Sequence, residues 1–298
     1  MIRVECEYVN ARIKGMKRHL LERSVFETLI LKPDVESIIA ELGKTAYKEE
    51  IEKASVQYSG STCIEVAIRR DLAPAFRKIL QFMKGDETEK YIRILIGRWD
   101  VQNIKTILRG KNIHVPSSEI IECLIPAGEL DEVTLSELIK QSDIRAVIDL
   151  LATWGSDYAK PLTRSYKDFT EKRDLSVLEY ALDQYYYKNA LNAVKGEGYD
   201  DRLMREMIMT EIDATNIKNV LRMVRDKISS DEAQGYLIKG GVMLDSERLV
   251  SMVKNGTLEG ALKLLEPTPY RFLAKLPEDV YKSGKISVFE KELEKYLI

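Results

Sequence analysis

The ten residues Asp100-Val-Gln-Asn-Ile-Lys-Thr-Ile-Leu-Arg109 return, with six identities and no gap, as Asp213-Ala-Thr-Asn-Ile-Lys-Asn-Val-Leu-Arg222. The two strings lie 113 residues apart (213 − 100 = 113). An internal repeat of this kind indicates an array of similar structural units, because each copy buries its apolar face against its neighbours. Duplicated surfaces usually build a scaffold, whereas active sites tend to be unique, so the repeat points away from catalysis.

The apolar periodicity around these strings predicts an all-α protein. Three stripes place apolar residues at i, i+3, i+4 and i+7, and sustained alternation of apolar and polar residues is scarce. Each stripe is closely followed by a helix-ending residue, and Asp100 and Asp213 are predicted to be helix N-caps. The stripes are Val35, Ile38, Ile39 and Leu42; Ile144, Val147, Ile148 and Leu151; and Leu258, Ala261, Leu262 and Leu265.

The three stripes belong to a larger repeat, at offsets of 109 (144 − 35) and 114 (258 − 144) residues. Each stripe is preceded by an apolar pair (Leu29-Ile30, Leu138-Ile139, Met252-Val253) and followed by a tyrosine (Tyr47, Tyr158, Tyr270). A further helix type, seen at Ile64–Ile68, Leu178–Leu182 and Phe289–Leu293, opens each new unit. We therefore predict the N-terminal part of a helical unit in residues 1–63, helical repeat units in 64–177 and 178–285, and the start of a further unit in 286–298.

Composition excludes several classes of protein. The 298 residues carry 46 basic and 48 acidic side chains, a net charge of −2, so no overall basic excess indicates a nucleic-acid or membrane-surface protein. Cys6, Cys63 and Cys123 are widely spaced and odd in number, which is typical of a reduced intracellular protein. The sequence shows no signal peptide and no apolar run of the roughly 18 residues that span a membrane.

No catalytic or metal-binding motif stands out. Gly43-Lys44-Thr45 resembles the end of a phosphate-binding loop, but Ile38 occupies the position of the required first glycine, so a helix end is favoured. His19 and His114 have no second histidine or cysteine at metal-ligand spacing. Tyr185-Tyr186-Tyr187, one to two turns after Tyr180, is interpreted as packing between repeats rather than base stacking. We expect no catalytic, cofactor-binding or metal-binding residues.

The repeated Asn-Ile-Lys-x-x-x-Arg frame is the main candidate site. Lys105 and Arg109 share one helical face, as do Lys218 and Arg222, and Asn10-Ala-Arg12 looks like a degenerate third copy. The basic face is either solvated or bound to a partner, and the asparagine and cation are alternatively ties between neighbouring helices. The candidate contact residues are Asn10, Arg12, Asn103, Lys105, Arg109, Asn216, Lys218 and Arg222.

Several of these motifs together resemble the C subunits of archaeal A-type (V/A-type) ATP synthases, which are related to the d subunits of vacuolar ATPases. The resemblance rests on Tyr8–Met16, Arg98–Lys111 and Asp213–Arg222 and runs through nearly the whole chain. It implies three pseudo-threefold-related helical units that form a funnel. The family continues with one more Glu-x-x-Asn-aliphatic-basic helix, so the third unit is expected to be incomplete after Ile298.

The resemblance also implies a function. A member of this family is a non-catalytic central-stalk subunit, which links the proteolipid rotor ring to the D and F subunits of the stalk and transmits torque for ATP synthesis coupled to proton or sodium transport. It lies on the cytoplasmic side of the cell membrane as a peripheral part of the complex. Neither nucleic-acid binding nor a homo-oligomer is expected.

The residues alone leave two other classes open. A helical-repeat scaffold or RNA-binding array would use the repeated basic faces to track phosphates, and its RNA affinity would fall steeply with salt. An enzyme with an unrecognised pocket would be revealed by a thermal shift with nucleotide.

Overall fold

The computed structural model describes residues 6–277, 280–281 and 284–297, and every regular element in these ranges is helical. The chain forms two compact units, Met1–Lys160 and Pro161–Ile298. All-α architecture is therefore confirmed. The funnel of three units and the division at residues 63, 177 and 285 stay predictions.

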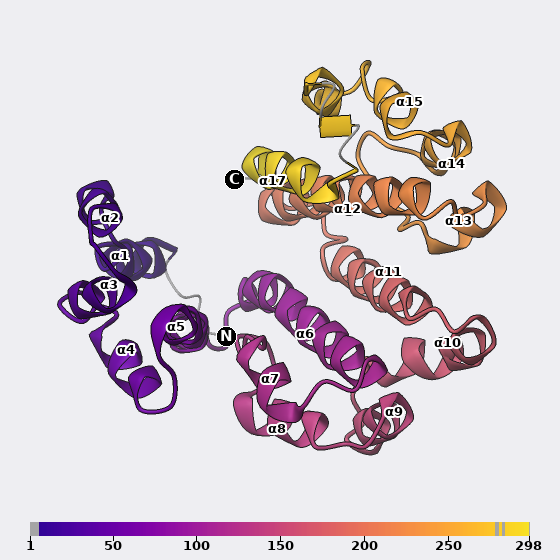
Figure 1. The fold of residues 1–298 in the computed structure, drawn as a ribbon. Helices are drawn as coiled ribbons and strands as arrows, with labels where there is room; N and C mark the ends of the chain where they lie inside the picture. Colours follow the sequence, from indigo (N-terminus) through magenta and orange to yellow (C-terminus); the bar gives the residue numbers. More distant parts are fainter. Residues whose placement is uncertain (1–5, 278–279, 282–283, 298) are drawn as a thin grey trace. The chain divides into compact units, whose positions relative to one another are not determined.

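The first unit runs from α1 to α9, and α10 crosses into the second (Figure 1). Their bounds are α1 Cys6–Lys17, α2 Arg23–Ile30, α3 Val35–Leu42, α4 Lys48–Ser55, α5 Gly60–Phe82, α6 Glu89–Asn112, α7 Ser117–Glu122, α8 Glu132–Ile139, α9 Ile144–Thr153 and α10 Ala159–Lys172. The second unit continues with α11 Ser176–Ala193, α12 Tyr199–Arg225, α13 Ser230–Tyr236, α14 Ser246–Asn255, α15 Leu258–Lys263, the 3-10 helix η1 Pro269–Lys275 and α17 Ile286–Leu297.

The three predicted stripes begin helices in the same way. Asp34, Asp143 and Thr257 each have extended backbone, and each side chain accepts a hydrogen bond from the N–H three residues later. The stripe of α9 is fully buried, whereas that of α3 buries only Leu42. The N-cap hydrogen bond is therefore the same in all three copies, whereas the burial of the apolar stripe differs between them.

The N-cap prediction for Asp100 and Asp213 is wrong. Asp100 lies eleven residues into α6 (100 − 89), and Asp213 lies fourteen residues into α12 (213 − 199). Both carboxylates are buried. An aspartate before an apolar run resembles an N-cap in the sequence, but here the helix has already started. The aspartate side chain instead accepts hydrogen bonds from main chain outside its own helix.

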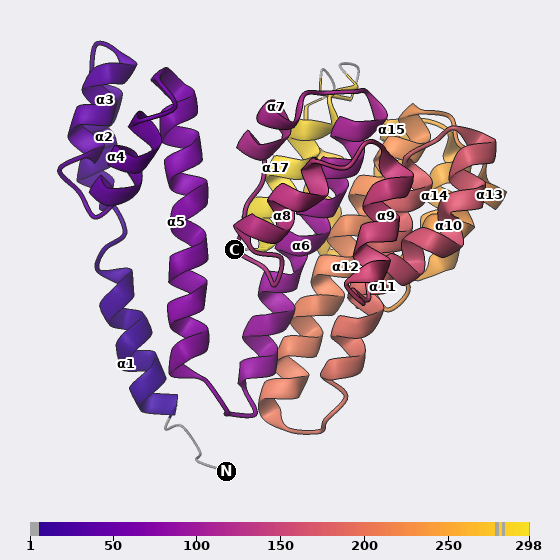
Figure 2. The same cartoon turned by 90° about the horizontal axis from the view of Figure 1, so that it is seen from below.

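Each unit is organised around long helices (Figure 2). In the first unit α4 packs along α5, and α7, α8 and α9 pack against α6. In the second unit α14, α15 and α17 pack against α12. The buried side chains of α17, which are Ile286, Phe289 and Leu293, join the core that α12 supplies.

Candidate functional site

Asn103 fixes the chain segment that follows α7. Its side-chain Nδ2 donates to the carbonyl of Ile125 at 2.7 Å, and its Oδ1 accepts from the N–H of the same residue at 2.8 Å. One side chain therefore satisfies both backbone groups of Ile125, as a neighbouring strand would. Asn103 is 1% exposed, so these two bonds replace water that cannot reach the site.

Asn216 repeats this arrangement in the second unit. Nδ2 donates to the carbonyl of Ile238 at 2.7 Å, and Oδ1 accepts from its N–H at 2.9 Å. Each asparagine holds a residue 22 positions later in the chain. We call each asparagine, together with the aspartate three residues before it, a backbone clamp.

The aspartates that lie three residues before these asparagines complete the clamps. Each accepts hydrogen bonds from backbone groups a few residues further along the segment that its asparagine holds. The carboxylate of Asp100 accepts from the N–H of Glu129 and from that of Leu130, both at 2.9 Å. The carboxylate of Asp213 accepts from the N–H of Met243 at 2.8 Å and from that of Leu244 at 3.3 Å. A buried carboxylate thus has backbone donors in place of water.

A glycine lies under each carboxylate. A Cβ added to Gly128 would overlap Oδ1 of Asp100, and one added to Gly241 would overlap Oδ1 of Asp213, both far inside van der Waals contact. Only glycine allows the backbone to approach the carboxylates this closely. The clamp thus combines an Asp-x-x-Asn helix with an Ile-x-x-Gly segment.

Burial dominates the electrostatics of the clamps. It raises the pKa of Asp100 to about 6, although the N–H groups of Leu130 and Glu129 act in the opposite direction. The pKa of Asp213 is also raised by burial, against hydrogen bonds from Met243 N–H and from the Tyr270 hydroxyl at 3.1 Å. These bonds hold the main chain of the two segments.

The basic positions of the repeated frame lie outside the clamps. Lys105 and Lys218 are half-buried and Arg109 is exposed. Arg222 forms an ion pair with Glu290 and so connects α12 to α17. Arg222 thus ties two helices together, whereas Asn103 and Asn216 tie their helices to irregular segments rather than to neighbouring helices. Contact of the basic faces with a partner stays a prediction.

Asn10 and Arg12 do not form a third clamp. Asn10 is exposed, and the guanidinium of Arg12 lies over the ring of Phe82, 4.6 Å from its centroid. Only 19 residues separate Asn10 from Leu29 (29 − 10), compared with 35 between Asn103 and Leu138 (138 − 103). The segment between α1 and α2 is thus too short to repeat the arrangement of α6, α7 and α8.

The residues that the clamps hold were not predicted from the sequence. Ile125 and Ile238 follow their asparagines at the same spacing, and Gly128 and Gly241 follow three residues later in both copies. The Asp-x-x-Asn string and the Ile-x-x-Gly string thus recur together at the same spacing. This joint recurrence was the feature of the sequence that could have predicted the clamps. Tyr270 was identified only as a marker of the repeat, and its bond to Asp213 carried no signal in sequence.

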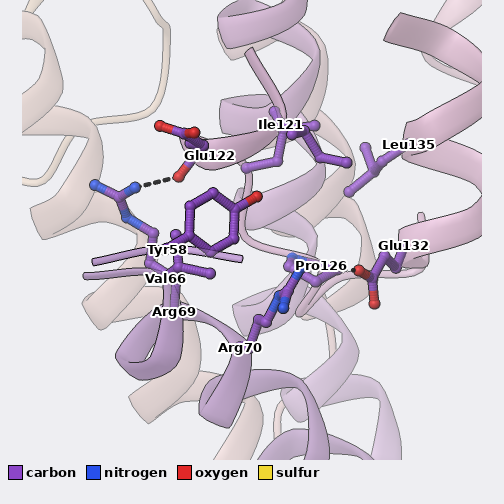
Figure 3. Close-up of a pocket in the computed structure, with 10 residues that line it drawn as sticks. Tyr58, Val66, Arg69, Arg70, Ile121, Glu122, Pro126, Glu132 and Leu135 are labelled. Atoms are coloured by element: carbon purple, nitrogen blue, oxygen red, sulfur yellow. Dashed lines mark hydrogen bonds and ion pairs between the residues drawn. The ribbon is translucent and has the colours of Figure 1, made fainter. Parts of the chain in front are cut away.

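A small cavity in the first unit lies between α5 and the segment that the first clamp holds (Figure 3). Two arginines reach its edge. Arg69 donates to the carbonyl of Glu122, and Arg70 pairs with Glu132 at 3.5 Å. The cavity measures about 30 Å³, which suits a single water molecule rather than a substrate.

The described part of the chain offers neither a metal site nor a membrane span. Within residues 6–277, 280–281 and 284–297, no three His, Cys, Asp or Glu side chains are grouped so that they could hold a metal ion. In the same ranges, every helix is too short or too polar to cross a bilayer.

The fold and the clamps define a class of protein, the all-helical repeat proteins in which buried polar side chains fix irregular segments to long helices. The particular family follows from comparison with known proteins. The family model described as "ATP synthase (C/AC39) subunit" matches residues 9–298. The chain belongs to this family, so the resemblance found in the sequence is confirmed.

Similar proteins from archaea carry a consistent name, the C subunit of the A-type ATP synthase. The protein of that name from Methanocaldococcus jannaschii is 28% identical over 98% of this chain and 72% of its own length. Those from Methanosarcina acetivorans and Methanosphaera stadtmanae are 30% and 29% identical, over 82% and 97% of this chain and 66% and 73% of their own lengths. The chain therefore spans about two thirds to three quarters of these relatives.

Proposed function

We propose that this chain is a non-catalytic central-stalk subunit of a rotary A/V-type ATP synthase. In this role it links the proteolipid rotor ring to the D and F subunits of the stalk and transmits torque during ATP synthesis coupled to proton or sodium transport. The observation that carries the proposal is the family match over residues 9–298. The shared name of the relatives, each a C subunit of an A-type ATP synthase, supports it.

The clamps give this role a physical basis. A subunit that transmits torque must resist deformation, and irregular segments are ordinarily its most compliant parts. Here Asp100 with Asn103, and Asp213 with Asn216, fix such segments to α6 and α12 through buried hydrogen bonds. The proposed position is the cytoplasmic side of the membrane, where the chain is held through its partners, with no nucleic acid and no second copy of itself.

Co-purification tests the proposal. In a strain that lacks its own C subunit, a tagged copy of this chain should bring down both the D–F stalk complex and the proteolipid ring. Recovery of neither would refute the central-stalk role. Salt-sensitive RNA binding in place of these partners would favour the RNA-binding class instead.

The basic faces of α6 and α12 are the proposed partner contacts, and Lys218 is the residue to test. Lys218→Glu should weaken binding to the stalk or ring more than it lowers the free energy of unfolding, because a rim charge mainly affects association. Lys291→Glu, at an exposed lysine of α17 in the same unit, is the matched control. An equal loss of stability with unchanged affinity would show that the Lys218 face is structural.

A further inference from the structure

Helix α1 carries a row of cations on one side. Lys14, Lys17 and Arg18 follow one another at i, i+3 and i+4 and so share one face at the C-terminal end of the helix, and all three are exposed. The row spans about 6 Å along the helix axis, which is less than the Debye length of roughly 8 Å at physiological salt. The three charges therefore act together on whatever lies opposite them. We call them the α1 cation row.

The opposite side of α1 packs on α5 and turns the row outward (Figure 2). Val9 is 8% exposed, and the guanidinium of Arg12 lies over the ring of Phe82 in α5. With about 3.6 residues per turn, positions 9 and 12 lie roughly opposite the α1 cation row. The helix is thus held on α5 by one side, and the row is left on the other.

The chain does not neutralise this row. Within the described residues, none of its three side chains forms an ion pair. Elsewhere in the same unit, surface cations pair with a carboxylate three or four residues away, as Lys53 does with Glu49 at 2.8 Å and Lys140 with Glu137 at 2.6 Å. Residues 8–21 contain no acidic residue, although the whole chain has a net charge of −2. The counter-charge for the row therefore comes from solution or from a partner.

An exposed aliphatic side chain accompanies the row and indicates which partner fits it. Leu20, two residues after Arg18, is 57% exposed, and Arg23 beyond it has 93% of its side chain exposed. Cations with an apolar side chain among them are typical of peripheral proteins on anionic membranes, because the cations bind headgroups while the apolar side chain enters the interface. A purely acidic polypeptide would leave Leu20 in water. A nucleic acid would be bound through more phosphate contacts and through stacking aromatic residues.

We propose that the α1 cation row, together with Leu20, is a contact surface for anionic phospholipid headgroups. The ammonium and guanidinium groups bind the lipid phosphates, and Leu20 packs just below them. Because the apolar side of α1 is occupied by α5, the helix rests on the headgroups without inserting, so binding is reversible and sensitive to salt. The proposal goes beyond the central-stalk role, in which partners hold the chain, and it does not depend on that role.

Vesicle flotation tests the proposal on the full chain without partners. One set of vesicles contains phosphatidylglycerol in phosphatidylcholine, and the other contains phosphatidylcholine alone. We expect the chain to float with the anionic vesicles at low salt and to stay in the soluble fraction with the neutral vesicles. Added salt should release it from the anionic vesicles, because screening weakens the attraction between exposed charges.

Variants of the row locate the surface. Lys14→Glu with Lys17→Glu and Arg18→Glu should lower the affinity for anionic vesicles at least about tenfold, because the attraction of three cations becomes repulsion. The corresponding triple glutamine variant should lower it as well, and it avoids placing acidic side chains at a helix C-terminus. Leu20→Ser should weaken binding about threefold or more, since the apolar part of the contact is lost.

A matched variant controls for net charge. Lys48→Glu with Lys140→Glu and Arg145→Glu makes the same change in charge at exposed positions of the same unit. This variant should bind anionic vesicles within about twofold of the wild type, because these residues lie outside the row. Circular dichroism checks that each variant retains its helical content.

Several results would overturn the proposal. These are an absence of flotation with anionic vesicles, equal flotation with neutral vesicles, unchanged binding of the row variants, and an equal loss in the control variant. If the chain floats with neither kind of vesicle but binds poly-L-glutamate through the row, the occupant is an acidic polypeptide. If it binds polyuridylate in that way, the occupant is a nucleic acid. Co-purification with the stalk and ring is a separate measurement, so either proposal can fail while the other stands.

Discussion

Asn103 and Asn216 each satisfy a donor and an acceptor on the backbone of a single residue. Replacing Asn216 by alanine should lower the free energy of unfolding of its unit by about 2–4 kcal/mol, because Ile238 N–H and C=O stay buried without partners. Asn10→Ala, at the exposed asparagine of the degenerate third copy, should change it by less than about 0.5 kcal/mol. Urea denaturation measures both, and equal effects would contradict the clamp.

Hydrogen exchange provides a local readout of the same residues. Asn103→Ala should speed amide exchange in peptides that cover residues 125–130 and leave peptides that cover 238–244 unchanged, since each clamp holds its own segment. Mass spectrometry of the exchanged chain distinguishes the two segments. Faster exchange throughout the chain would mean that Asn103 acts on global stability alone.

The glycines under the carboxylates should be equally sensitive. Gly241→Ala would push a methyl group into Asp213, and we expect a loss of about 2–4 kcal/mol from strain and broken hydrogen bonds. Gly235→Ala is the control in the same unit, because its Cβ would meet nothing within 4 Å inside α13. That substitution should stabilise the helix by up to about 1 kcal/mol. Thermal unfolding measures both, and similar effects would contradict the close approach.

Asp100 makes stability depend on pH in a direction opposite to that of a typical ion-paired carboxylate. Its pKa is about 6 in the folded chain, above its ordinary value of 3.8, so the folded state takes up a proton more readily than the unfolded state as pH falls. The contribution of Asp100 to stability should therefore rise between pH 7.5 and pH 5 and fall as pH increases through 6. The free energy of unfolding of the wild type, relative to Asp100→Asn, should increase as the pH is lowered over that range. A flat difference would contradict the raised pKa.

At the scale of elements, equivalent residues of the repeat should differ sharply in their importance. Ile139→Ser should cost about 3–5 kcal/mol, because it removes a buried side chain and leaves a hydroxyl in the core. Ile30→Ser, at the corresponding position of α2, should cost less than about 0.5 kcal/mol, since 80% of that residue is exposed. Chemical denaturation of the two variants measures the contrast, and a similar cost would mean that α2 is covered within the chain.

The elements also show how far prediction from the sequence reached. The stripes predicted α3, α9 and α15, because an apolar face at helical spacing needs no knowledge of its partner. The start of α6 was misplaced, because its first eleven residues mix polar and apolar types and Asp100 resembles a cap. Two of the three candidate asparagines, Asn103 and Asn216, do tie segments together, but their roles required knowledge of which backbone lies opposite. The spacing of residues along the sequence does not show which backbone segment lies opposite a given asparagine.

At the scale of the whole molecule, the proposed function predicts a mechanical phenotype. Complexes assembled with Asn103→Ala and Asn216→Ala together should retain ATP hydrolysis by the catalytic head and show reduced ion-driven ATP synthesis, because a less rigid connector stores twist that it should transmit. Co-purification first establishes that the variant assembles, and complexes with Asn10→Ala are the control. Unchanged synthesis with demonstrably loosened clamps would mean that rigidity at these segments is not what the complex requires.

The clamps bind main chain, and exposed side chains of the second clamped segment, such as Lys239, Val242 and Met243, take no part in these bonds. Pro126 and Ala127 in the first segment stand where Lys239 and Gly240 stand in the second, and the hydrogen bonds to Ile125 and Ile238 are nonetheless the same. The exposed position Lys239 can therefore vary without disturbing the backbone hydrogen bonds, provided that Gly241 and Gly240, which has φ +101°, are kept. Such segments are suitable sites for grafting foreign loops, and co-evolution with a partner could proceed there one substitution at a time.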